Sequence, residues 1–443
     1  MRHQQTNWRS SLARAVLCAA AVVAPLGGVA CKGLLDVKNP NNIAEESLNN
    51  PQAADQQANG VEASTTRMLS AVSVPYGVAT DELDWIGSRD AWFDLEKGAI
   101  SNYLNEFTDG AFPYVGEARY LGDQTVTRLA DFNAKGALSN KASLARTYLY
   151  TAITYATIAD MWDDFAFSNK TTPAPAVGRA NMVKLYDTAI GYLDKALPLA
   201  GTNADLQYAI TAYRARAKQG KAIWQKITPE GQTPPSPLVN DAGANTDARA
   251  ALALKSGADD KFRLTSNVEA QPGINIWFEV NGRNESKIGI AFTTLNDPIT
   301  GTRDPVSAAI AAEFKAFGSQ AGVFTITSDR EMHLILAEAA LAANDLVTFQ
   351  TEINAVRSLD NLPDWTPAST LTASAILQHE RMVNLMLMRR RLADLYRFGN
   401  KVKEWTTDPN FKSAVNTAGL LFPIPNIERQ ANPCIANPSA CGQ

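Results

Sequence analysis

Small side chains recur along the apolar stripes of this chain, and this pattern restricts the fold to closely packed helices. The clearest stripe lies in residues 139–162, where Leu144, Tyr148, Ala152 and Ala159 share one helical face. This spacing predicts an amphipathic helix, because residues three or four positions apart lie side by side on a helix. A small residue at every fourth position lets two helices approach closely. The pattern therefore predicts helices that bury their stripes against one another.

The other periodic segments form hairpins of two helices joined by short turns. Ser328 and Glu331 form a capping box at the start of one helix, and Gly399 is well placed to end the last. Hairpins in series are typical of tetratricopeptide-type stacking, although the strict consensus spacing is absent and an unspecific helical bundle remains the alternative. We predict a mainly α fold with further helices over residues 51–68, 115–132, 182–197, 206–227, 328–343, 346–357 and 373–398. Residues 206–227 form either one helix or two that meet near Gly220.

Two segments depart from the helical periodicity. Residues 75–114 are rich in Gly, Asp and aromatic residues, which predicts a break between helices. Residues 228–327 form a predicted irregular insertion rich in Pro, Gly, Asn and Asp. Within it, the β-favouring runs 274–278 and 288–294 predict small strands or irregular structure.

The first thirty residues have the features of a secretory signal peptide. Three arginines precede an apolar run at residues 15–24, which is followed by Pro25 and Val29-Ala30-Cys31. A small residue directly before a cysteine resembles a bacterial lipobox, in which the cysteine is lipidated and becomes the new N-terminus. Gly28 departs from that pattern, and ordinary secretion with an incidental Cys31 is the alternative. We expect lipidation at Cys31 and a polar tether over residues 31–50, so acyl chains alone anchor the protein.

Composition excludes several classes of function. Lys and Arg total 41 against 45 Asp and Glu, a formal charge of −4, which lacks the basic excess needed for nucleic-acid binding. The chain has three histidines and four cysteines, and neither His333 nor His379 has another His or Cys at metal-ligand spacing. There is no Walker-type loop and no G-x-G-x-x-G after a predicted strand. We therefore predict no metal, no cofactor and no nucleic-acid partner.

Two cysteines lie close together near the end of the chain. Cys434 and Cys441 are the pair that remains if Cys18 leaves with the signal peptide and Cys31 carries lipid. An exported protein meets an oxidising compartment, so we expect a disulfide that closes a short loop. Two free thiols on the tail are the alternative.

Aromatic residues outside the helical stripes are the best candidates for a ligand site. Flat aromatic faces stack on the apolar faces of sugar rings, while nearby carboxylates and guanidinium groups bond to hydroxyls. For any one aromatic residue, filling the core beneath a long loop is the more common role. As a set, the predicted ligand-binding residues are Trp85, Arg89, Asp90, Trp92, Phe93, Tyr103 and, in the insertion, Trp277.

Five segments taken together resemble one family. Leu35-Asp36-Val37 with Pro40 follows Cys31, and a helix with Ala145-Arg146 ends in Ala159-Asp160-Met161-Trp162-Asp163-Asp164. A late hairpin holds 334–339 and 354–357, and a long helix carries Glu380-Arg381, Arg391 and Asp394. Leu421-Phe422-Pro423-Ile424-Pro425, with Asn432-Pro433, closes the chain. In this order the segments resemble the SusD/RagB family of outer-membrane nutrient-binding lipoproteins.

The resemblance implies a tetratricopeptide-like superhelix of four helix pairs with an irregular, loop-rich ligand-binding portion. Residues 51–443 would form this single domain, with the insertion at about 228–327. The resemblance also implies a partner, a SusC/RagA-like TonB-dependent β-barrel transporter, to which a captured glycan or peptide is delivered. The location implied is the bacterial outer membrane, through the lipid anchor only.

The sequence departs from the family pattern within the predicted long helix. Asn384 and Met388-Arg389 stand where the family usually has Glu and Glu-Gly. The charges of this helix suit packing better than catalysis, because paired charges on helices commonly orient neighbouring elements. The proline-containing tail at 421–425 cannot continue a helix, so we expect it extended, with Phe422 and Ile424 as buried anchors.

The sequence therefore favours nutrient capture without chemistry. A secreted helical-repeat adaptor that binds only proteins is the alternative from another class. A glycoside hydrolase with a pair of carboxylates is less favoured, because no catalytic constellation is visible, although any two of the many acidic residues could converge.

Overall fold

Alanine-rich helices form most of the computed structural model, which describes residues 45–169, 171–254, 256–266, 273–407 and 417–441. The longest are α2 (Ala54–Ala79), α4 (Glu106–Ala134), α5 (Lys141–Met161) and α7 (Ala204–Ile227). Asparagine side chains begin three of them: Asn105, Asn140 and Asn203 each accept a hydrogen bond from the first turn. The predicted helices at 139–162 and 182–197 are confirmed as α5 and α6 (Lys184–Ala196).

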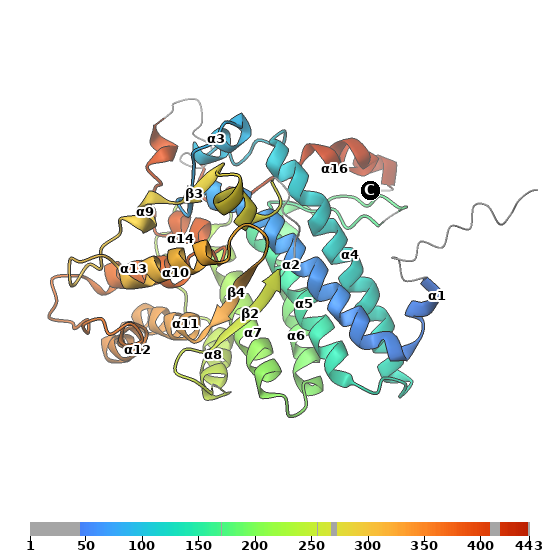
Figure 1. Cartoon of the computed structure of the whole chain (residues 1–443), viewed down its shortest axis with the longest axis horizontal. Helices are drawn as coiled ribbons and strands as arrows, with labels where there is room; N and C mark the ends of the chain where they lie inside the picture. Colours follow the sequence, from blue (N-terminus) through green and yellow to red (C-terminus); the bar gives the residue numbers. More distant parts are fainter. Residues whose placement is uncertain (1–44, 170, 255, 267–272, 408–416, 442–443) are drawn as a thin grey trace, which may run out of the picture. The chain divides into compact units, whose positions relative to one another are not determined.

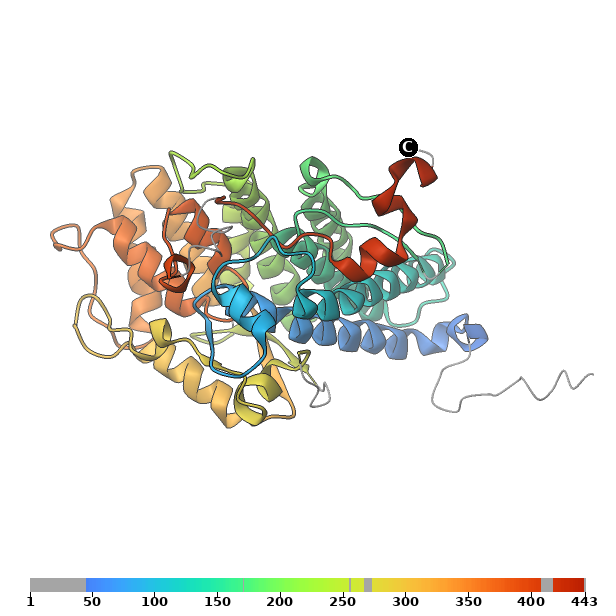
Figure 2. The same ribbon diagram turned by 90° about the horizontal axis from the view of Figure 1, so that it is seen from above.

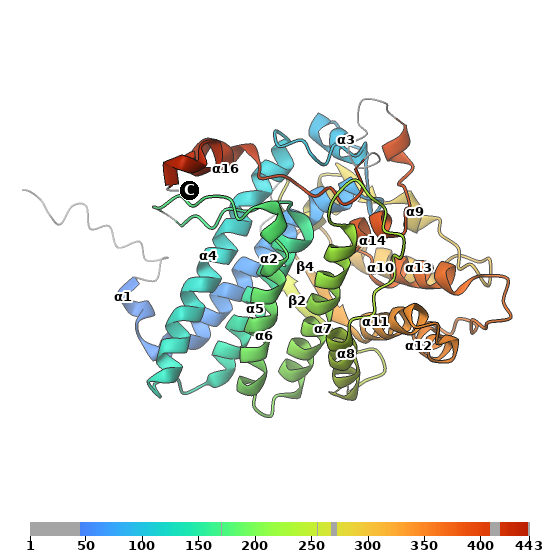
Figure 3. The same cartoon turned by 180° about the vertical axis from the view of Figure 1, so that it is seen from behind.

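The helices pack in four pairs among the described residues. α2 packs on α4, α5 on α6, α7 on α8 (Ala242–Leu254), and α11 (Asp329–Ala342) on α12 (Leu346–Ser358). The pairs lie side by side from α2 to α12 in Figures 1 and 3. The small residues predicted to allow close approach are buried: Ala152, Ala156 and Ala159 of α5 are at most 2% exposed. The mainly α fold with stacked helix pairs is confirmed.

Two helices are longer than the sequence predicts. α2 continues through Pro75 to Ala79, and α4 begins at Glu106 and passes through Pro113. The predicted break over 75–114 is therefore confined to residues 80–105. Tertiary burial overrides the local signal here, because α2 is buried at every position from Met68 to Ala79. Gly220 likewise lies inside a single helix, α7.

The prediction of one long helix over residues 373–398 is wrong. The structure has two helices there, α13 (Ala373–Asn384) and α14 (Arg391–Arg397). Between them, Leu387 and Arg389 both adopt a left-handed backbone conformation with φ of 61°. Non-glycine residues rarely adopt this conformation, because their Cβ crowds the backbone. The carboxylate of Glu82, from the loop after α2, accepts the Leu387 N–H at 2.6 Å and holds the break in place.

The insertion contains helices as well as strands. β2 (Lys261–Ser266) pairs antiparallel with β4 (Gly322–Ser328), and α8 and α10 (Pro305–Ala316) flank them. Of the two alternatives predicted for the β-favouring runs, small strands or irregular structure, the strand alternative holds only at Ile288. Residues 274–278 lead into the π-helix η4 (Phe278–Gly282), and only Ile288 of the second run belongs to a strand, β3 (Ser286–Ile288). The rest of that run forms α9 (Ile290–Thr293).

Short elements complete the fold. Before the first long helix come α1 (Glu45–Leu48) and the 3-10 turn η1 (Pro51–Ala53), and between α2 and α4 come β1 (Leu83–Trp85) and α3 (Asp90–Glu96). Further 3-10 turns are η2 (Arg179–Asn181), η3 (Leu197–Leu199), η5 (Glu404–Thr406) and η6 (Pro438–Cys441). The chain ends in α16 (Asn426–Ala431) and α17 (Pro433–Ala436).

The proline-containing tail lies extended against the helices, as predicted. Phe422 donates its N–H to the Met161 carbonyl at 2.9 Å and accepts the Asp163 N–H at 3.0 Å. Phe422 and Ile424 are 1% and 3% exposed, so they are the expected buried anchors. Figure 2 shows the C-terminal segment, in red, running from here past the teal helix α4.

The described residues divide into two units. Those from Pro51 onward form one compact unit, and residues 45–50 belong to the other. Among the described helices, none combines the length and apolar character needed to cross a bilayer. The predicted signal peptide, Cys31 and the Leu35-Asp36-Val37 motif lie outside the described residues.

Candidate ligand-binding site

The pairing of two short strands brings the aromatic segment beside the insertion. β1 pairs antiparallel with β3, with Leu83 opposite Ile288 and Trp85 opposite Ser286. Beyond β1, the N–H groups of Ile86 and Gly87 both donate to the Glu285 carbonyl, at 2.9 and 3.0 Å. Residues about 200 positions apart in sequence are thereby fixed next to each other, and the loop after β1 starts from a defined point.

Glu285 also fixes the first turn of this loop. Its Oε2 accepts the Ser88 N–H at 3.1 Å. A Cβ at position 87 would overlap this carboxylate, so only glycine allows the backbone to pass this close. The loop therefore leaves the strand pair with its direction set by Glu285.

The residues after Gly87 line an open hollow of about 530 Å³, here called the surface hollow. Two predicted site residues, Arg89 and Asp90, belong to its wall. α3 and the start of α4 supply further lining residues, and Figure 1 shows α3 close to the upper end of α4. The complete lining is Ser88, Arg89, Asp90, Ala91, Asp94, Asn102, Leu104, Asn105 and Glu106.

Arg89 is held in place by two residues at the start of α4. Its Nη2 lies 2.9 Å from the Glu106 carboxylate, and its guanidinium lies 4.3 Å from the centre of the Phe107 ring. Phe107 also stacks on Trp92: the two rings are parallel, with their centres 3.3 Å apart. The Phe107 ring therefore contacts both Arg89, a lining residue of the hollow, and the buried Trp92.

Carboxylates give the hollow its hydrogen-bonding character. Burial raises the pKa of Asp94 above its ordinary value, and the nearby Asp90 carboxylate raises it further. Asn105 has a structural role. Its Oδ1 accepts the Phe107 N–H and so caps α4, and its Nδ2 donates to the Ala91 carbonyl at 2.8 Å. Asp90 and Asp94 can accept from sugar hydroxyls, and Arg89 can donate to them.

Exposed apolar side chains gather around the same region. Tyr103 is 42% exposed, and the Arg429 guanidinium lies 4.9 Å from its ring centre. Ile290 follows β3 and donates its N–H to Asp84 at 2.9 Å, so it lies beside β1. Such clustering marks a contact surface more often than scattered single residues do. Of the seven large hydrophobic side chains exposed among the described residues, five are in this region: Ile86, Tyr103, Leu104, Ile290 and Ile427.

The structure separates the predicted aromatic site residues into two groups. Tyr103 presents its ring to solvent, whereas Trp92 and Trp277 are 0% and 1% exposed. Trp85 is half-buried, with its ring edge-on to Phe93 at 5.6 Å. The burial of Trp92 and Trp277 fits the alternative that they are core residues and not rings presented at the surface hollow.

Sequence reasoning missed several residues of the hollow. Asn102, Leu104 and Glu106 were not singled out, although their position between a polar turn and a helix start is visible in sequence. The exposure of Ile290, which lies in a β-favouring run, was missed as well, because an apolar residue gives no sign of its exposure. The lining of the hollow thus extends from Ser88 to Glu106, the first residue of α4.

Comparison with known proteins finds similarity to one family. The model of the SusD family matches residues 331–437. A SusD superfamily protein from Bacteroides fragilis has a TM-score of 0.60 at 14% identity and covers 87% of this chain and 98% of its own. The chain is therefore similar to the SusD family over residues 331–437, and it shares the fold of this superfamily protein. A SusD-like carbohydrate binding protein from Bacteroides vulgatus has a TM-score of 0.53 at 12% identity, covering 87% of this chain and 97% of its own.

A second Bacteroides fragilis structure, of a SusD-like protein, has a TM-score of 0.60 at 10% identity and covers 89% of this chain and 98% of its own. At such low sequence identities, the structural similarity shows that the fold is shared and nothing beyond the fold. A search of curated proteins finds no match.

The segment that matches the SusD family holds a buried ion-pair network. Glu338 of α11 accepts from Arg397 and lies 3.4 Å from Arg381, and Asp394 accepts from both arginines at 2.8–2.9 Å. Burial alone would raise the pKa of Asp394, but the two guanidinium groups lower it to about 2. The charges of the predicted long helix therefore join α11, α13 and α14, which is the packing role expected of them.

One group of side chains has the composition of a metal site. Asp297, His379 and Glu380 place ligand atoms within 4.8 Å of one another. However, Arg357 Nη1 lies between the two carboxylates, 2.8 Å from Asp297 and 2.5 Å from Glu380. His379 Nε2 is bonded to Asp304 at 3.0 Å. The Arg357 guanidinium thus takes the position that a metal ion would need.

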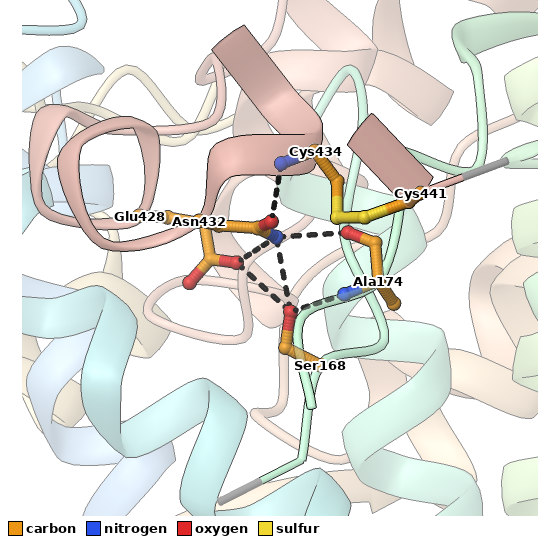
Figure 4. The surroundings of a disulfide bond; sticks show 6 residues. All are labelled: Ser168, Ala174, Glu428, Asn432, Cys434 and Cys441. Atoms are coloured by element: carbon orange, nitrogen blue, oxygen red, sulfur yellow. Dashed lines mark hydrogen bonds between the residues drawn. A yellow bond between two sulfur atoms is a disulfide. The ribbon is translucent and has the colours of Figure 1, made fainter. Parts of the chain in front are cut away.

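The two C-terminal cysteines are joined in the structure. Cys434 and Cys441 form a disulfide, with Cα atoms 5.5 Å apart. Figure 4 shows how Asn432 fastens the segment: its Nδ2 donates to Ser168 Oγ and to the Ala174 carbonyl, and its Oδ1 accepts the Cys434 N–H. The disulfide loop is therefore attached to the loop after α5.

Proposed function

We propose that this SusD/RagB-like protein binds an extracellular nutrient, an oligosaccharide or a peptide, at the surface hollow and does no chemistry on it. The observation that carries the proposal is that Arg89, Asp90 and Asp94 line one open hollow, while the exposed Tyr103 stands in sequence between two further lining residues, Asn102 and Leu104. A tyrosine face, a guanidinium and carboxylates together suit a sugar, which has apolar ring faces and hydroxyl edges. The carbohydrate-binding name of one structural relative supports an oligosaccharide as the first ligand class to test.

We further propose that Cys31 is lipidated and anchors the protein at the outer membrane. The bound nutrient is then delivered to a SusC/RagA-like TonB-dependent transporter. Both statements rest on the sequence features of residues 15–31 and on the family. Co-purification of a TonB-dependent transporter with the intact lipoprotein, from outer membranes of cells that express both, tests the second.

The binding proposal has a direct experiment. The purified protein is screened against oligosaccharide and peptide libraries, and the affinity of each hit is measured for the wild type and for Tyr103→Ala. We expect Tyr103→Ala to weaken binding by about 1–3 kcal/mol, the range of an anchor residue. Leu346→Ala is the matched control, because Leu346 is also about 40% exposed but lies at the start of α12, outside the surface hollow.

Two outcomes would replace the proposal. If the protein binds neither library, and binds only other proteins, it is an adaptor, for which the exposed aliphatic residues Ile86, Leu104 and Ile290 would supply the contact. If an oligosaccharide hit is shortened during incubation and Asp90→Asn abolishes this, the protein is a hydrolase. Release of new reducing ends, measured on the same hits, separates binding from hydrolysis.

A further inference from the structure

A second pocket lies between the insertion and the break that separates α13 from α14. Its volume is about 130 Å³ and it is open to solvent at α10, where Ala309 is exposed. Trp277 is part of its wall, which gives this predicted ligand-binding residue a place away from the surface hollow. The apolar lining comprises Ile276, Trp277, Val306, Ala309, Ile310 and Phe314, with Phe317, Val323, Phe324 and Met386–Met388. We call it the apolar pocket.

Aromatic rings dominate one side of the apolar pocket. Trp277 and Phe314 are stacked, with ring centres 5.9 Å apart and planes at 19°. Phe324 lies 4.7 Å from Trp277 at a tilted angle. The opposite side is formed by residues 386–388, and the two methionines there have flexible, polarisable side chains that adapt to the shape of a ligand. Such walls favour a flat apolar ring.

The polar groups at the rim are already paired. Arg263 lies 2.9 Å from Glu313, and Lys261 lies 3.1 Å from Asp259. Arg330 pairs with Asp360, and also donates to Asn384 at 2.9 Å. All five charged residues of the lining are included in these pairs. A charged ligand would have to lose its water without gaining an opposite charge, which is costly.

Size limits the ligand to a small molecule. A cavity of about 150 Å³ lined by apolar residues binds benzene. We propose that the apolar pocket binds a small uncharged molecule that carries one aromatic ring. This binding is independent of the proposed nutrient site, because no residue lines both the apolar pocket and the surface hollow.

The test uses two ring compounds of nearly equal size that differ in charge. Fluorine NMR measures binding of para-fluorophenol, which is neutral at pH 7, and of para-fluorobenzoate, which is an anion. We expect para-fluorophenol to bind at least about tenfold more tightly than para-fluorobenzoate. Absence of para-fluorophenol binding up to about 5 mM, or equal binding of both compounds, would overturn the proposal.

A pair of variants on α10 locates the binding. Ala309→Trp fills the apolar pocket and should weaken para-fluorophenol binding by at least about tenfold. Ala312→Trp adds the same side chain to the same helix, outside the lining, and should leave the affinity unchanged. Both alanines are exposed, so melting curves should show both variants folded. Unchanged binding in folded Ala309→Trp would place the site elsewhere and overturn the proposal.

Discussion

The Glu82 carboxylate accepts a hydrogen bond from the Leu387 N–H at 2.6 Å, across 305 positions of sequence. Glu82 is 1% exposed, and its burial raises its pKa to about 7; the nearby Asp81 also raises it, whereas the Leu387 N–H, Arg391 and Arg389 lower it. One buried group thus joins the loop that leads to the surface hollow with the break between α13 and α14.

Glu82→Gln should change how stability depends on pH. The pKa of Glu82 is higher in the folded than in the unfolded protein, so the folded state binds the extra proton. The contribution of Glu82 to stability is therefore full below about pH 4.5 and is lost as the pH rises toward 7. Glutamine keeps the acceptor but cannot ionise. We expect Glu82→Gln to remove a decline of up to about 3 kcal/mol between these pH values, measured by urea unfolding. An unchanged pH profile would contradict the assignment to Glu82.

Replacing Arg389 by glycine should stabilise the protein relative to replacing it by alanine. Both variants lose the same buried side chain, but only glycine adopts φ of 61° without crowding. We expect Arg389→Gly to unfold at higher denaturant than Arg389→Ala, by about 1 kcal/mol. In an ordinary helix alanine would be the more stable of the two, so the order itself tests the left-handed conformation.

Trp92→Ala should reduce stability rather than binding alone. Trp92 is buried and stacks on Phe107, so its removal leaves a cavity that costs about 3–5 kcal/mol. Melting temperature and ligand affinity should be measured on the same sample. Weaker binding at an unchanged melting temperature would mean that Trp92 contacts the ligand directly.

Reduction of the C-terminal disulfide should have a small effect. The loop between Cys434 and Cys441 spans only seven positions, so its closure restricts little of the unfolded chain. We expect the double variant Cys434→Ser, Cys441→Ser to lose less than about 3 kcal/mol. Mass spectrometry of non-reduced protein from its native compartment should find no free thiol at either position, and alkylation of both would refute the pairing there.

Cys31→Ser should move the protein from the membrane to the soluble fraction. An acyl chain contributes about 0.8 kcal/mol for each buried CH₂, and the substitution removes the thiol that would carry it. Cells that lack the transporter should be used, because a partner could retain the unlipidated protein. Continued fractionation with outer membranes under those conditions would exclude lipidation at Cys31.

The sequence predicted a helix well where the residues that the helix buries are close together in the sequence. α5 and α6 follow from periodicity, because the residues that they bury are three or four positions apart. The break after Asn384 could not be predicted in this way. Met388, Leu392 and Leu395 continue the apolar spacing of α13, and the break depends on Glu82, a residue distant in sequence.

The candidate site was predicted in part. Arg89 and Asp90 do line the surface hollow, because a charged residue in a turn between helices tends to stay near solvent. The tryptophans could not be placed from sequence, since an aromatic residue in a loop is equally suited to cover a core. Trp92 is buried because Phe107, the second residue of α4, lies parallel to it.

The segment between Gly87 and Asn105 is fastened at both ends: Glu285 holds its start, and Asn105 caps α4 at its end. A foreign sequence grafted between these points would inherit both attachments. It would also have to supply a buried side chain in the place of Trp92, which packs on Phe107. Recognition of a new nutrient could therefore arise by exchange of the exposed positions of this one stretch while its buried positions are kept.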